Sequence, residues 1–486
     1  MNNAKQIFFF MIGPFFARLL SFLSLPIISY FVSIEDFGIY TLFTMLLMYF
    51  VPLVTLSTDQ YFLRTYTKEN GIKLRKNLSI MYSMIFMLLL LGLLIFFNIY
   101  QSILFEQKFL YITALIVAFF NSLQELYTRT LRAENMGEYY SLVIVVSQVS
   151  GLIFTIVFVI ITKDIIGLVV GQFAAAFVNL IFNIFIYRKK LKNQEKESRE
   201  NENISTKPLD IGILKASLTF SLPLLPGVFL WVVQSTIGRL FVLKFLTDYD
   251  LGIYGVGIRF ATITNLFVTS FLVFWEPKLY QFFDKYEDTI DFKQASQKYK
   301  NIYSLMIELI IVMLFIFNPL LIQILSSSYQ NALYIIPLMI FQNYIHGYNY
   351  FCGYGPQLTG KTKKTILPFV ISVIVNFLFN LIFIKKLGII SVLIGSNLGF
   401  MTLLLLNYSI SNKLVKNNIR LGSEIIRIVC YNFIAVFYYY SKSYFFSLIL
   451  FLIIFSFNIF NSRAHLKLYY LEIKNMLKEK FKKQKI

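Results

Sequence analysis

The sequence predicts an all-α integral membrane protein with about 14 transmembrane helices. Apolar residues make up 57% of the 486 residues and charged residues only 14%, whereas average proteins carry about 25% charged residues. The apolar residues gather in runs of about 20 or more, the length of helix that crosses about 30 Å of hydrocarbon. In addition, two nearly identical pentapeptides divide the chain into two similar halves. These three observations exclude a soluble globular protein.

Fourteen apolar segments, taken in order, account for the predicted helices. They cover residues 7–32, 37–62, 77–98, 109–128, 139–161, 165–187, 216–245, 252–275, 301–323, 331–352, 366–384, 388–411, 424–440 and 443–462. The first segment is too long for a removable signal peptide and lacks a small-residue cleavage site.

The net charge of +20 reflects membrane topology. Most of the 45 Lys and Arg residues lie in 64–76, 188–215, 278–300, 413–427 and the tail from 463. An even number of predicted helices separates each of these segments from the next, as the positive-inside rule requires. We therefore expect both termini in the cytoplasm, the lipid bilayer as the surrounding medium, and no nucleic acid as a partner.

The pentapeptides DFGIY (36–40) and DLGIY (250–254) predict two like-oriented lobes. They lie between the first and second and between the seventh and eighth predicted helices, so the repeat is displaced by six helices. Because six is even, the halves share one orientation, an arrangement used by secondary transporters. We expect an N-terminal six-helix lobe, a cytoplasmic linker, a C-terminal six-helix lobe, two extra transmembrane helices and a basic cytoplasmic tail, at 1–187, 188–215, 216–412, 413–462 and 463–486.

The composition argues against metal, redox and nucleotide chemistry. Cys352 and Cys430 fall within predicted helices, and the two histidines, His346 and His465, are too few for a His-based metal centre. The segment GPQLTGKT (355–362) has the letters of a phosphate-binding loop, but that chemistry requires a strand before the loop and a helix after it in a soluble α/β domain. Here the segment joins two predicted membrane helices. We therefore expect no metal, no cofactor and no ATP binding.

Charged side chains within the predicted spans mark the candidate substrate cavity. Arg18, Arg239 and Arg259 lie in the first, seventh and eighth spans, and the acids Asp59 and Glu308 lie in the second and ninth. Such charges cost about 2.5–3.5 kcal/mol each on insertion scales and normally face a bundle interior or an aqueous cavity. An excess of Arg favours an anion, because the guanidinium fork matches phosphate. Alternatively, these Arg pair with the acids or with backbone carbonyls and hold helices together.

Uncharged polar residues recur at helical spacing on three predicted spans. They are Gln172, Asn179 and Asn183; Gln342, His346 and Asn349; and Ser372, Asn376 and Asn380. Such faces can hydrogen-bond sugar hydroxyls, and the nearby Tyr344 and Tyr348 can stack on sugar rings. They serve equally well as contacts between helices, worth about 0.6 kcal/mol each on average.

Two prolines occur in the leading helix of each predicted lobe. These are Pro14 and Pro26 in the first span and Pro223 and Pro226 in the seventh. Because proline removes a helical hydrogen bond and clashes with the preceding turn, we expect both helices to be bent.

The order and spacing of several stretches resemble those of a known family. The stretches are FARLLSFLSLPIISYFVSIEDFGIYTL, STDQYFLRTY, SLPLLPG, GRLFVLKFLTDYDLGIYGVGIRFA, FWEPKLY, LTGKTKKT and VNFLFNLIFIKKLGIISVLIGSNLGF. Over about residues 5–412 the chain resembles the polysaccharide biosynthesis proteins, the O-antigen or capsular repeat-unit flippases. These belong to the multidrug, oligosaccharidyl-lipid and polysaccharide exporter superfamily.

This resemblance implies a transporter rather than an enzyme. Its substrate would be a polyprenyl-pyrophosphate-linked oligosaccharide, moved by alternating access across the bacterial plasma membrane for surface polysaccharide synthesis. Arg18, Arg239 and Arg259 would project into a cationic cavity between the lobes. Asp59 and Glu308 would be available to bind a coupling ion, and association with other polysaccharide-assembly proteins is left open.

One position departs from the family pattern, and two other functions compete with the flippase. Many relatives carry Asp-Arg in the seventh helix where this chain has Gly238-Arg239, so any ion-pair or proton-coupling role of that Asp is missing. A cation-coupled drug or small-metabolite exporter of the same superfamily would be expected to have a cavity centred on carboxylates. A membrane polymerase or glycosyltransferase would normally have a long outer loop.

Overall fold

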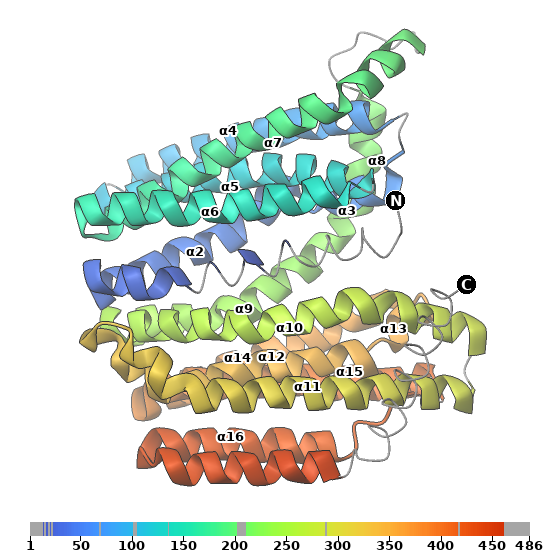
Figure 1. The fold of residues 1–486 in the computed structure, drawn as a ribbon. Helices are drawn as coiled ribbons and strands as arrows, with labels where there is room; N and C mark the ends of the chain where they lie inside the picture. Colours follow the sequence, from blue (N-terminus) through green and yellow to red (C-terminus); the bar gives the residue numbers. More distant parts are fainter. Residues whose placement is uncertain are drawn as a thin grey trace, which may run out of the picture. The chain divides into compact units, whose positions relative to one another are not determined.

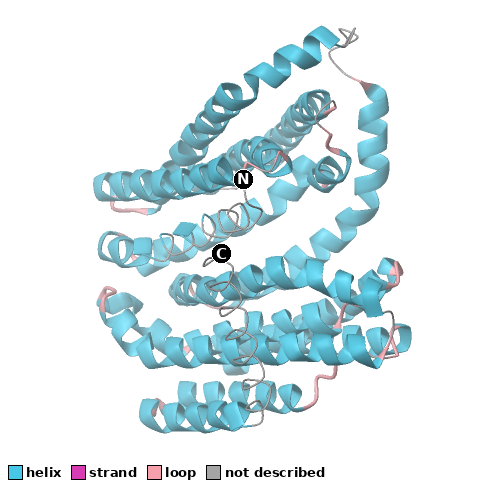
Figure 2. Cartoon of the chain, turned by 45° about the vertical axis from the view of Figure 1, so that its right-hand side comes forward, coloured by secondary structure: helices cyan, strands magenta, loops and turns pink. Residues whose placement is uncertain are grey.

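The computed structural model describes residues 23–67, 70–100, 105–134, 136–201, 210–286, 289–416 and 418–460, together with Gly13, Phe16, Ala17 and Leu20. Every regular element within these residues is a helix (Figure 2). The chain is divided into two compact units. The first comprises Met1–Gly255 with Leu325–Tyr329, and the second comprises Val256–Ile324 with Gln330–Ile486.

The first unit contains the following helices. They are α2 (Ile34–Thr55), α3 (Thr58–Thr65), α4 (Gly71–Ile99), α5 (Phe105–Ala133), α6 (Gly137–Thr162), α7 (Ile165–Asn201), α8 (Ile211–Ser221), the 3₁₀ turn η1 (Leu222–Leu224), α9 (Leu225–Phe245) and the first residues of α10 (Asp248–Tyr286). Within this unit α5 packs against α2, α4 and α7, and α6 packs along α7 (Figure 1).

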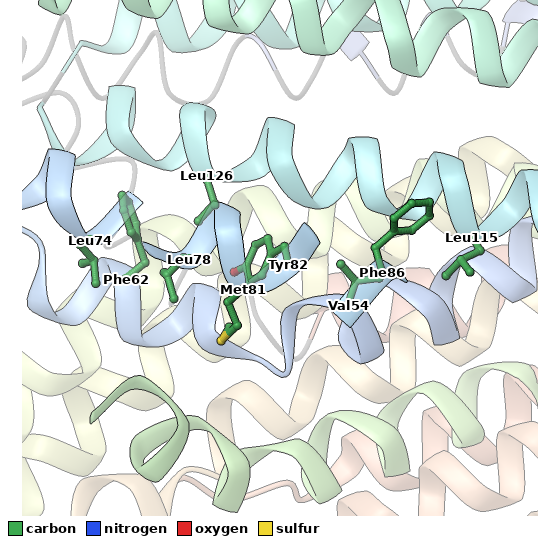
Figure 3. Close-up of a cluster of buried hydrophobic side chains, with 9 residues drawn as sticks. All are labelled: Val54, Phe62, Leu74, Leu78, Met81, Tyr82, Phe86, Leu115 and Leu126. Carbon is green, nitrogen blue, oxygen red and sulfur yellow. The ribbon is translucent and has the colours of Figure 1, made fainter. Parts of the chain in front are cut away.

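A buried apolar cluster joins α2, α3, α4 and α5 (Figure 3). Its members are Val54, Phe62, Leu74, Leu78, Met81, Tyr82, Phe86, Leu115 and Leu126. Five of them lie on α4 with successive spacings of four, three, one and four residues, so one face of that helix is buried. On another face Leu88, Leu91 and Ile95 are exposed. An apolar helix with an apolar exposed face fits a lipid environment, because hydrocarbon does not penalise that exposure.

The second predicted span, 37–62, is divided in the structure. It forms α2 and α3, and Leu56 and Ser57 between them adopt left-handed backbone angles, with φ of 46° and 57°. Pro52 lies inside the last turn of α2, where it cannot donate a helical hydrogen bond. The sequence prediction missed this break because the apolar run continues through it.

The seventh predicted span, 216–245, is bent as expected. The 3₁₀ turn η1 separates α8 from α9; Pro223 is inside η1 and Pro226 is in the first turn of α9. In the first span Pro26 lies within helical residues, whereas Pro14 lies outside the described residues.

Asp210 fixes the start of α8. Its carboxylate accepts hydrogen bonds from the backbone N–H groups of Gly212 and Ile213, at 2.9 and 3.3 Å, and pairs with Lys73 at 2.8 Å. The hydrogen bond from Lys73 is the largest cause that lowers the pKa of the Asp210 carboxyl. This attachment joins the end of the segment predicted as a linker to α4.

The two repeated turns begin their helices with similar side-chain caps. Ser33 precedes α2, and its hydroxyl accepts from the backbone N–H of Asp36 at 3.1 Å. Thr247 precedes α10, and its hydroxyl accepts from Asp250 N–H at 3.2 Å while the Asp250 carboxylate accepts from Thr247 N–H at 3.2 Å. This reciprocal pattern is a capping box with Asp in place of Glu. The helices therefore begin three or four residues earlier than predicted.

The second unit contains the rest of α10 and the following elements. They are α11 (Ile290–Gln323), the greater part of the 3₁₀ segment η2 (Ser327–Tyr334), α12 (Ile336–Cys352), α13 (Gly355–Leu358), η3 (Thr362–Thr365), α14 (Ile366–Leu387), α15 (Ile389–Leu414), α16 (Ser423–Ser441) and the helix Tyr444–Phe460. Here α15 packs against α12, α13 and α14, and α12 also contacts α11 and α16.

The predicted spans correspond closely to the helices observed. Ten helical segments of the described residues are long and apolar enough to cross a membrane. The predicted spans at 331–352, 424–440 and 443–462 correspond to α12, α16 and Tyr444–Phe460. The predicted first span lies largely outside the described residues, although 23–31 are helical. The all-α membrane class is thus confirmed, while the predicted lobe boundaries stay a prediction.

Candidate functional site

Arg239 ties α9 to α2 within the first unit. Its side chain is 6% exposed, and Nη1 donates to the carbonyl oxygen of Thr41 and to the hydroxyl of Thr44, both at 3.3 Å. The neighbouring hydroxyls of Thr236 and Tyr49 form a further bond between the same helices at 2.7 Å. This geometry matches the alternative in which the guanidinium holds helices together.

The other two predicted arginines differ in what the structure describes. Arg259 is half-buried on α10 in the second unit, and its carbonyl oxygen accepts a hydrogen bond from the Thr262 hydroxyl at 2.6 Å. Arg18 lies outside the described residues. The cationic cavity therefore stays a prediction.

The polar face of α12 is only partly accessible. Gln342 and His346 are half-buried, whereas Asn349 is buried. His346 Nε2 lies 3.1 Å from the Tyr350 hydroxyl, and the Asn349 amide oxygen accepts from Asn407 on α15 at 3.1 Å. The exposed surface of this face is therefore greatest at Gln342 and His346, one helical turn apart.

Asn376 and Asn380 lie at the contact between α14 and α15 and are fully buried. The Asn380 amide donates to the Asn376 side-chain oxygen at 2.8 Å, and the Ser391 hydroxyl donates to the Asn380 oxygen at 3.4 Å. A Cβ atom on Gly395 of α15 would lie 2.6 Å from the Asn380 amide nitrogen. Small residues and polar side chains at such close approaches are typical of helix association in membranes.

Asp59 forms an ion pair that the sequence analysis did not anticipate. Its carboxylate lies 2.8 Å from Arg129 Nη2 on α5, and Arg129 Nε lies 2.9 Å from Glu125 one turn earlier. Asp59 and Arg129 are about one-fifth exposed and the Glu125 side chain is half exposed. Two carboxylates thus share one guanidinium. The Glu125/Arg129 spacing of four residues was the sequence signal for this site.

Glu308 lies at the centre of a buried charge network in the second unit. The carboxylate is fully buried and accepts from Arg427 Nε at 2.9 Å, from the Tyr344 hydroxyl at 2.6 Å and from the Tyr431 hydroxyl at 3.2 Å. The Asn458 amide donates to its second oxygen at 2.8 Å. Buried carboxylates require such compensation, because desolvation strongly disfavours an unpaired charge.

Two further charges complete this network. Lys300 pairs with Glu424, and Arg427 Nη2 lies 3.5 Å from the same Glu424 oxygen. Two cations and two anions are therefore balanced among Lys300, Glu308, Glu424 and Arg427. Lys300 and Glu308 are eight residues apart on α11, and Glu424 and Arg427 are three apart on α16. These two spacings were the signals for the network that the sequence contained, although they do not reveal that α11 and α16 meet.

The segment with the letters of a phosphate-binding loop has a different structure. It lies between α12 and α14 and comprises the one-turn helix α13 followed by the start of η3. Lys361 is exposed, and Gly360 adopts a left-handed φ of 69°. The segment is a compact connection between two helices.

Solved structures of membrane transporters have the same fold. The lipid II flippase MurJ in an inward closed conformation matches with a TM-score of 0.63 and 16% identity, over 95% of this chain and 99% of that chain. An inward-facing multidrug resistance MATE transporter matches with a TM-score of 0.60 and 15% identity, over 82% and 94%. The Vibrio cholerae MATE transporter VcmN in its bent form gives 0.54 and 15%, over 85% and 97%. The chain therefore has a multi-pass membrane transporter fold.

The sequence comparison identifies the family directly. No curated protein sequence matches the chain. Residues 4–283, more than half of the chain, match the family described as polysaccharide biosynthesis protein. The resemblance found in the repeated turns and their flanking helices is therefore confirmed, and the chain belongs to the polysaccharide biosynthesis protein family.

Proposed function

We propose that this protein is a flippase that moves polyprenyl-pyrophosphate-linked oligosaccharide repeat units across the bacterial plasma membrane. The observation that carries the proposal is the match of residues 4–283 to polysaccharide biosynthesis proteins. The similarity in fold to a lipid II flippase supports it, because that protein also handles a lipid-linked substrate. The repeat unit would be used for surface polysaccharide synthesis, and the protein itself would catalyse no covalent chemistry.

In this proposal the headgroup occupies a cationic cavity lined by Arg18, Arg239 and Arg259. Arginine suits pyrophosphate because its planar fork can donate two hydrogen bonds to one phosphate group. Arg239 would exchange its bonds to Thr41 and Thr44 for the pyrophosphate during the cycle, so substrate binding would loosen the attachment of α9 to α2.

The polar residues of α12 are better placed for sugars than those of α14. Gln342 and His346 are half-buried, whereas Asn376 and Asn380 are fully buried. We assign Gln342, His346 and Asn349 to the sugar-binding surface. Asn376 and Asn380 would join this surface only if the contact between α14 and α15 opened.

Of the two proposed ion-coupling acids, Asp59 is favoured by charge balance. The Glu308 carboxylate is surrounded by Arg427, Tyr344, Tyr431 and Asn458, so a cation would have to displace several partners. Asp59 instead competes with Glu125 for Arg129, and a proton or sodium ion could satisfy one carboxylate. Coupling to such an ion would give transport its direction without ATP.

The proposed topology follows from the distribution of basic residues. Both termini lie in the cytoplasm, with the tail 463–486 on that side, and the lipid tail of the substrate stays in the bilayer. Other polysaccharide-assembly proteins are candidate partners, because a flipped repeat unit must be consumed on the outer side.

Deletion of the gene provides the test. Lipid-linked repeat units should accumulate in the cytoplasmic leaflet, and the surface polysaccharide should disappear until the wild-type gene is restored. The repeat units are quantified after extraction from spheroplasts, with and without a membrane-impermeant reagent that modifies only outward-facing headgroups. Normal export in the deletion strain would refute the flippase.

The fold similarity to multidrug resistance MATE transporters favours one alternative. A cation-coupled exporter would protect cells from cationic drugs, and its deletion would leave surface polysaccharide unchanged. Drug survival measured in the same deletion strain distinguishes the two functions.

A further inference from the structure

Three tyrosines and a carboxylate gather at one end of the second unit. Glu276 and Tyr280 lie one turn apart near the end of α10, Tyr350 lies in the last turn of α12, and Tyr354 precedes α13. Figure 1 shows the end of α10 and α13 at the same end of this unit. We call these four residues the tyrosine–carboxylate cluster.

Direct contacts connect all four members of the cluster. The Tyr354 hydroxyl donates to Glu276 Oε1 at 2.5 Å. The Tyr354 ring lies 6.0 Å from that of Tyr280 in an edge-to-face arrangement and 6.3 Å from that of Tyr350. Burial and the bond to Glu276 raise the pKa of Tyr354, so its hydroxyl keeps the proton that it donates.

The cluster lies beyond the apolar spans and is partly accessible. In the sequence the apolar run of α10 ends at Trp275, before Glu276 and Tyr280. Glu276 is exposed and Tyr280 is 37% exposed. The sequence suggested Tyr344 and Tyr348 for stacking on sugars. By contrast with Tyr280, these two tyrosines are fully buried and bonded to the Glu308 network. The aromatic surface most open to a ligand is therefore that of Tyr280 on α10 rather than that of Tyr344 and Tyr348 on α12.

Packed aromatic side chains, Trp275 and Phe351, support the tyrosine–carboxylate cluster. The fully buried Trp275 donates from its indole Nε1 to the Tyr350 carbonyl oxygen at 2.8 Å. Its ring stacks on that of Phe351 at 4.9 Å. Binding groups held by packed neighbours in this way are pre-organised, which lowers the entropy lost when a ligand binds.

We propose that the tyrosine–carboxylate cluster binds neutral sugar rings of the oligosaccharide as it enters from the cytoplasmic side. A sugar ring presents apolar C–H groups on its face and hydroxyl groups around its edge. Tyr280 offers exposed ring surface to the former, while the Glu276 carboxylate and the tyrosine hydroxyls accept or donate hydrogen bonds to the latter. The inference rests on the proposed flippase function and assigns a sugar subsite to it.

The same chemistry argues against phosphate and disfavours an organic cation. The negative charge of Glu276 repels phosphate. A cation requires open ring faces, but the edge-to-face contact of Tyr280 and Tyr354 covers part of one ring face with the other ring. A sugar makes use of both the remaining ring surface and the hydroxyl groups.

Trp275 provides a fluorescent reporter for the test. The chain has two tryptophans, so Trp231→Phe leaves only the one that contacts Tyr350. The purified Trp231→Phe protein in lipid nanodiscs is titrated with three probes. These are the oligosaccharide released by mild acid from the cell's lipid-linked intermediates, inorganic pyrophosphate, and tetraphenylphosphonium.

Only the oligosaccharide should give a saturable change in Trp275 fluorescence. Tyr280→Leu should raise its Kd about tenfold, whereas Tyr280→Phe, which keeps the ring, should change it by less than about threefold. Glu276→Gln should retain measurable oligosaccharide binding, because the amide still accepts hydrogen bonds. An absent oligosaccharide response, an unchanged Kd in Tyr280→Leu, or a response to tetraphenylphosphonium that Glu276→Gln abolishes would each overturn the subsite.

A cellular assay separates failure of the subsite from failure of the flippase. If the deletion strain exports polysaccharide normally, the flippase function is wrong. If the wild-type gene restores export and the Tyr280→Leu gene restores it equally well, the flippase stands and the sugar subsite is wrong. Slower export with Tyr280→Leu than with Tyr280→Phe, at equal protein levels, supports the subsite.

Discussion

Gly38 and Gly252, the glycines of the two repeated turns, touch each other through their backbones. A Cβ atom on Gly38 would lie 2.8 Å from Gly252 N and 2.5 Å from the Asp248 carbonyl oxygen, and one on Gly252 would overlap the Ile34 carbonyl. In the repeat, Gly38 corresponds to Gly252 and Ile34 to Asp248. Each turn thus uses the same positions to contact the other, as in a two-fold symmetric interface.

Alanine at either glycine should destabilise this contact. Gly38→Ala and Gly252→Ala each insert a methyl group against the backbone of the opposite helix, and overpacking typically costs about 1–3 kcal/mol. We expect a lower Tm for both variants in one detergent. Gly92→Ala and Gly151→Ala are the controls, because no atom lies within 4 Å of a Cβ there; these should be neutral or stabilising by up to about 1 kcal/mol. Similar Tm values for all four variants would contradict the close contact.

The repeat was visible in the sequence, but its self-contact was not. A repeated pattern shows that two segments fold alike, and it does not show that they meet. The same limit applies to the charges. Asp59 and Glu308 stand out as acids in apolar runs, whereas their partners Arg129 and Arg427 could be assigned only once the rotation of each helix about its axis was known.

Chain breaks and buried aromatics set a second limit. Pro223 and Pro226 correctly predicted the bend of the seventh helix, but the break after Pro52 was hidden by continuous apolar residues. Tyr344 and Tyr348 have the helical spacing of a ligand surface, and the structure buries both against the Glu308 network. A spacing pattern identifies the residues that share a helix face and cannot say what covers that face.

The buried pair of Glu308 and Arg427 should be strongly coupled. Glu308→Gln removes the nearer of two carboxylates from the buried Arg427 guanidinium, and breaking a buried ion pair typically costs about 3–5 kcal/mol. The double variant Glu308→Gln/Arg427→Gln should be less destabilised than the sum of the two single variants, since Lys300 and Glu424 stay paired. Thermal unfolding of all three variants measures the coupling.

An exposed pair serves as the control for this experiment. Glu125→Gln removes one partner of Arg129 where the side chain is half exposed, and such pairs contribute about 0–1 kcal/mol. If Glu125→Gln lowered the Tm as much as Glu308→Gln, burial would not be the cause of the difference.

Arg239 can be tested for substrate binding separately from helix attachment. Arg239→Ala should abolish export, and Arg239→Lys should retain part of it if the positive charge serves the pyrophosphate. Thr44→Val removes one hydrogen-bond partner of the guanidinium and keeps the charge, so it should leave export near wild type. Export is measured as surface polysaccharide at equal protein level. Full export in Arg239→Ala would rule out a role in substrate binding, whereas equal loss of export in Arg239→Ala and Thr44→Val would assign the residue to helix attachment.

Asp59 should affect the coupling of transport far more than the stability of the fold. Its ion pair with Arg129 is partly exposed, so Asp59→Asn should cost no more than about 1 kcal/mol. In the proposed coupling, one of the carboxylates of Asp59 and Glu125 binds the coupling ion while the other pairs with Arg129. Removal of either charge leaves a single carboxylate, which pairs with Arg129, so that no carboxylate is left to bind the ion. Both Asp59→Asn and Glu125→Gln should therefore lose the response of transport to imposed proton or sodium gradients, measured in vesicles that contain the lipid-linked repeat unit. A Glu308→Gln protein that folds well enough to assay should keep that response, because its network is balanced without an added ion. The reverse result, with the gradient response lost only in Glu308→Gln, would move the coupling site into the second unit.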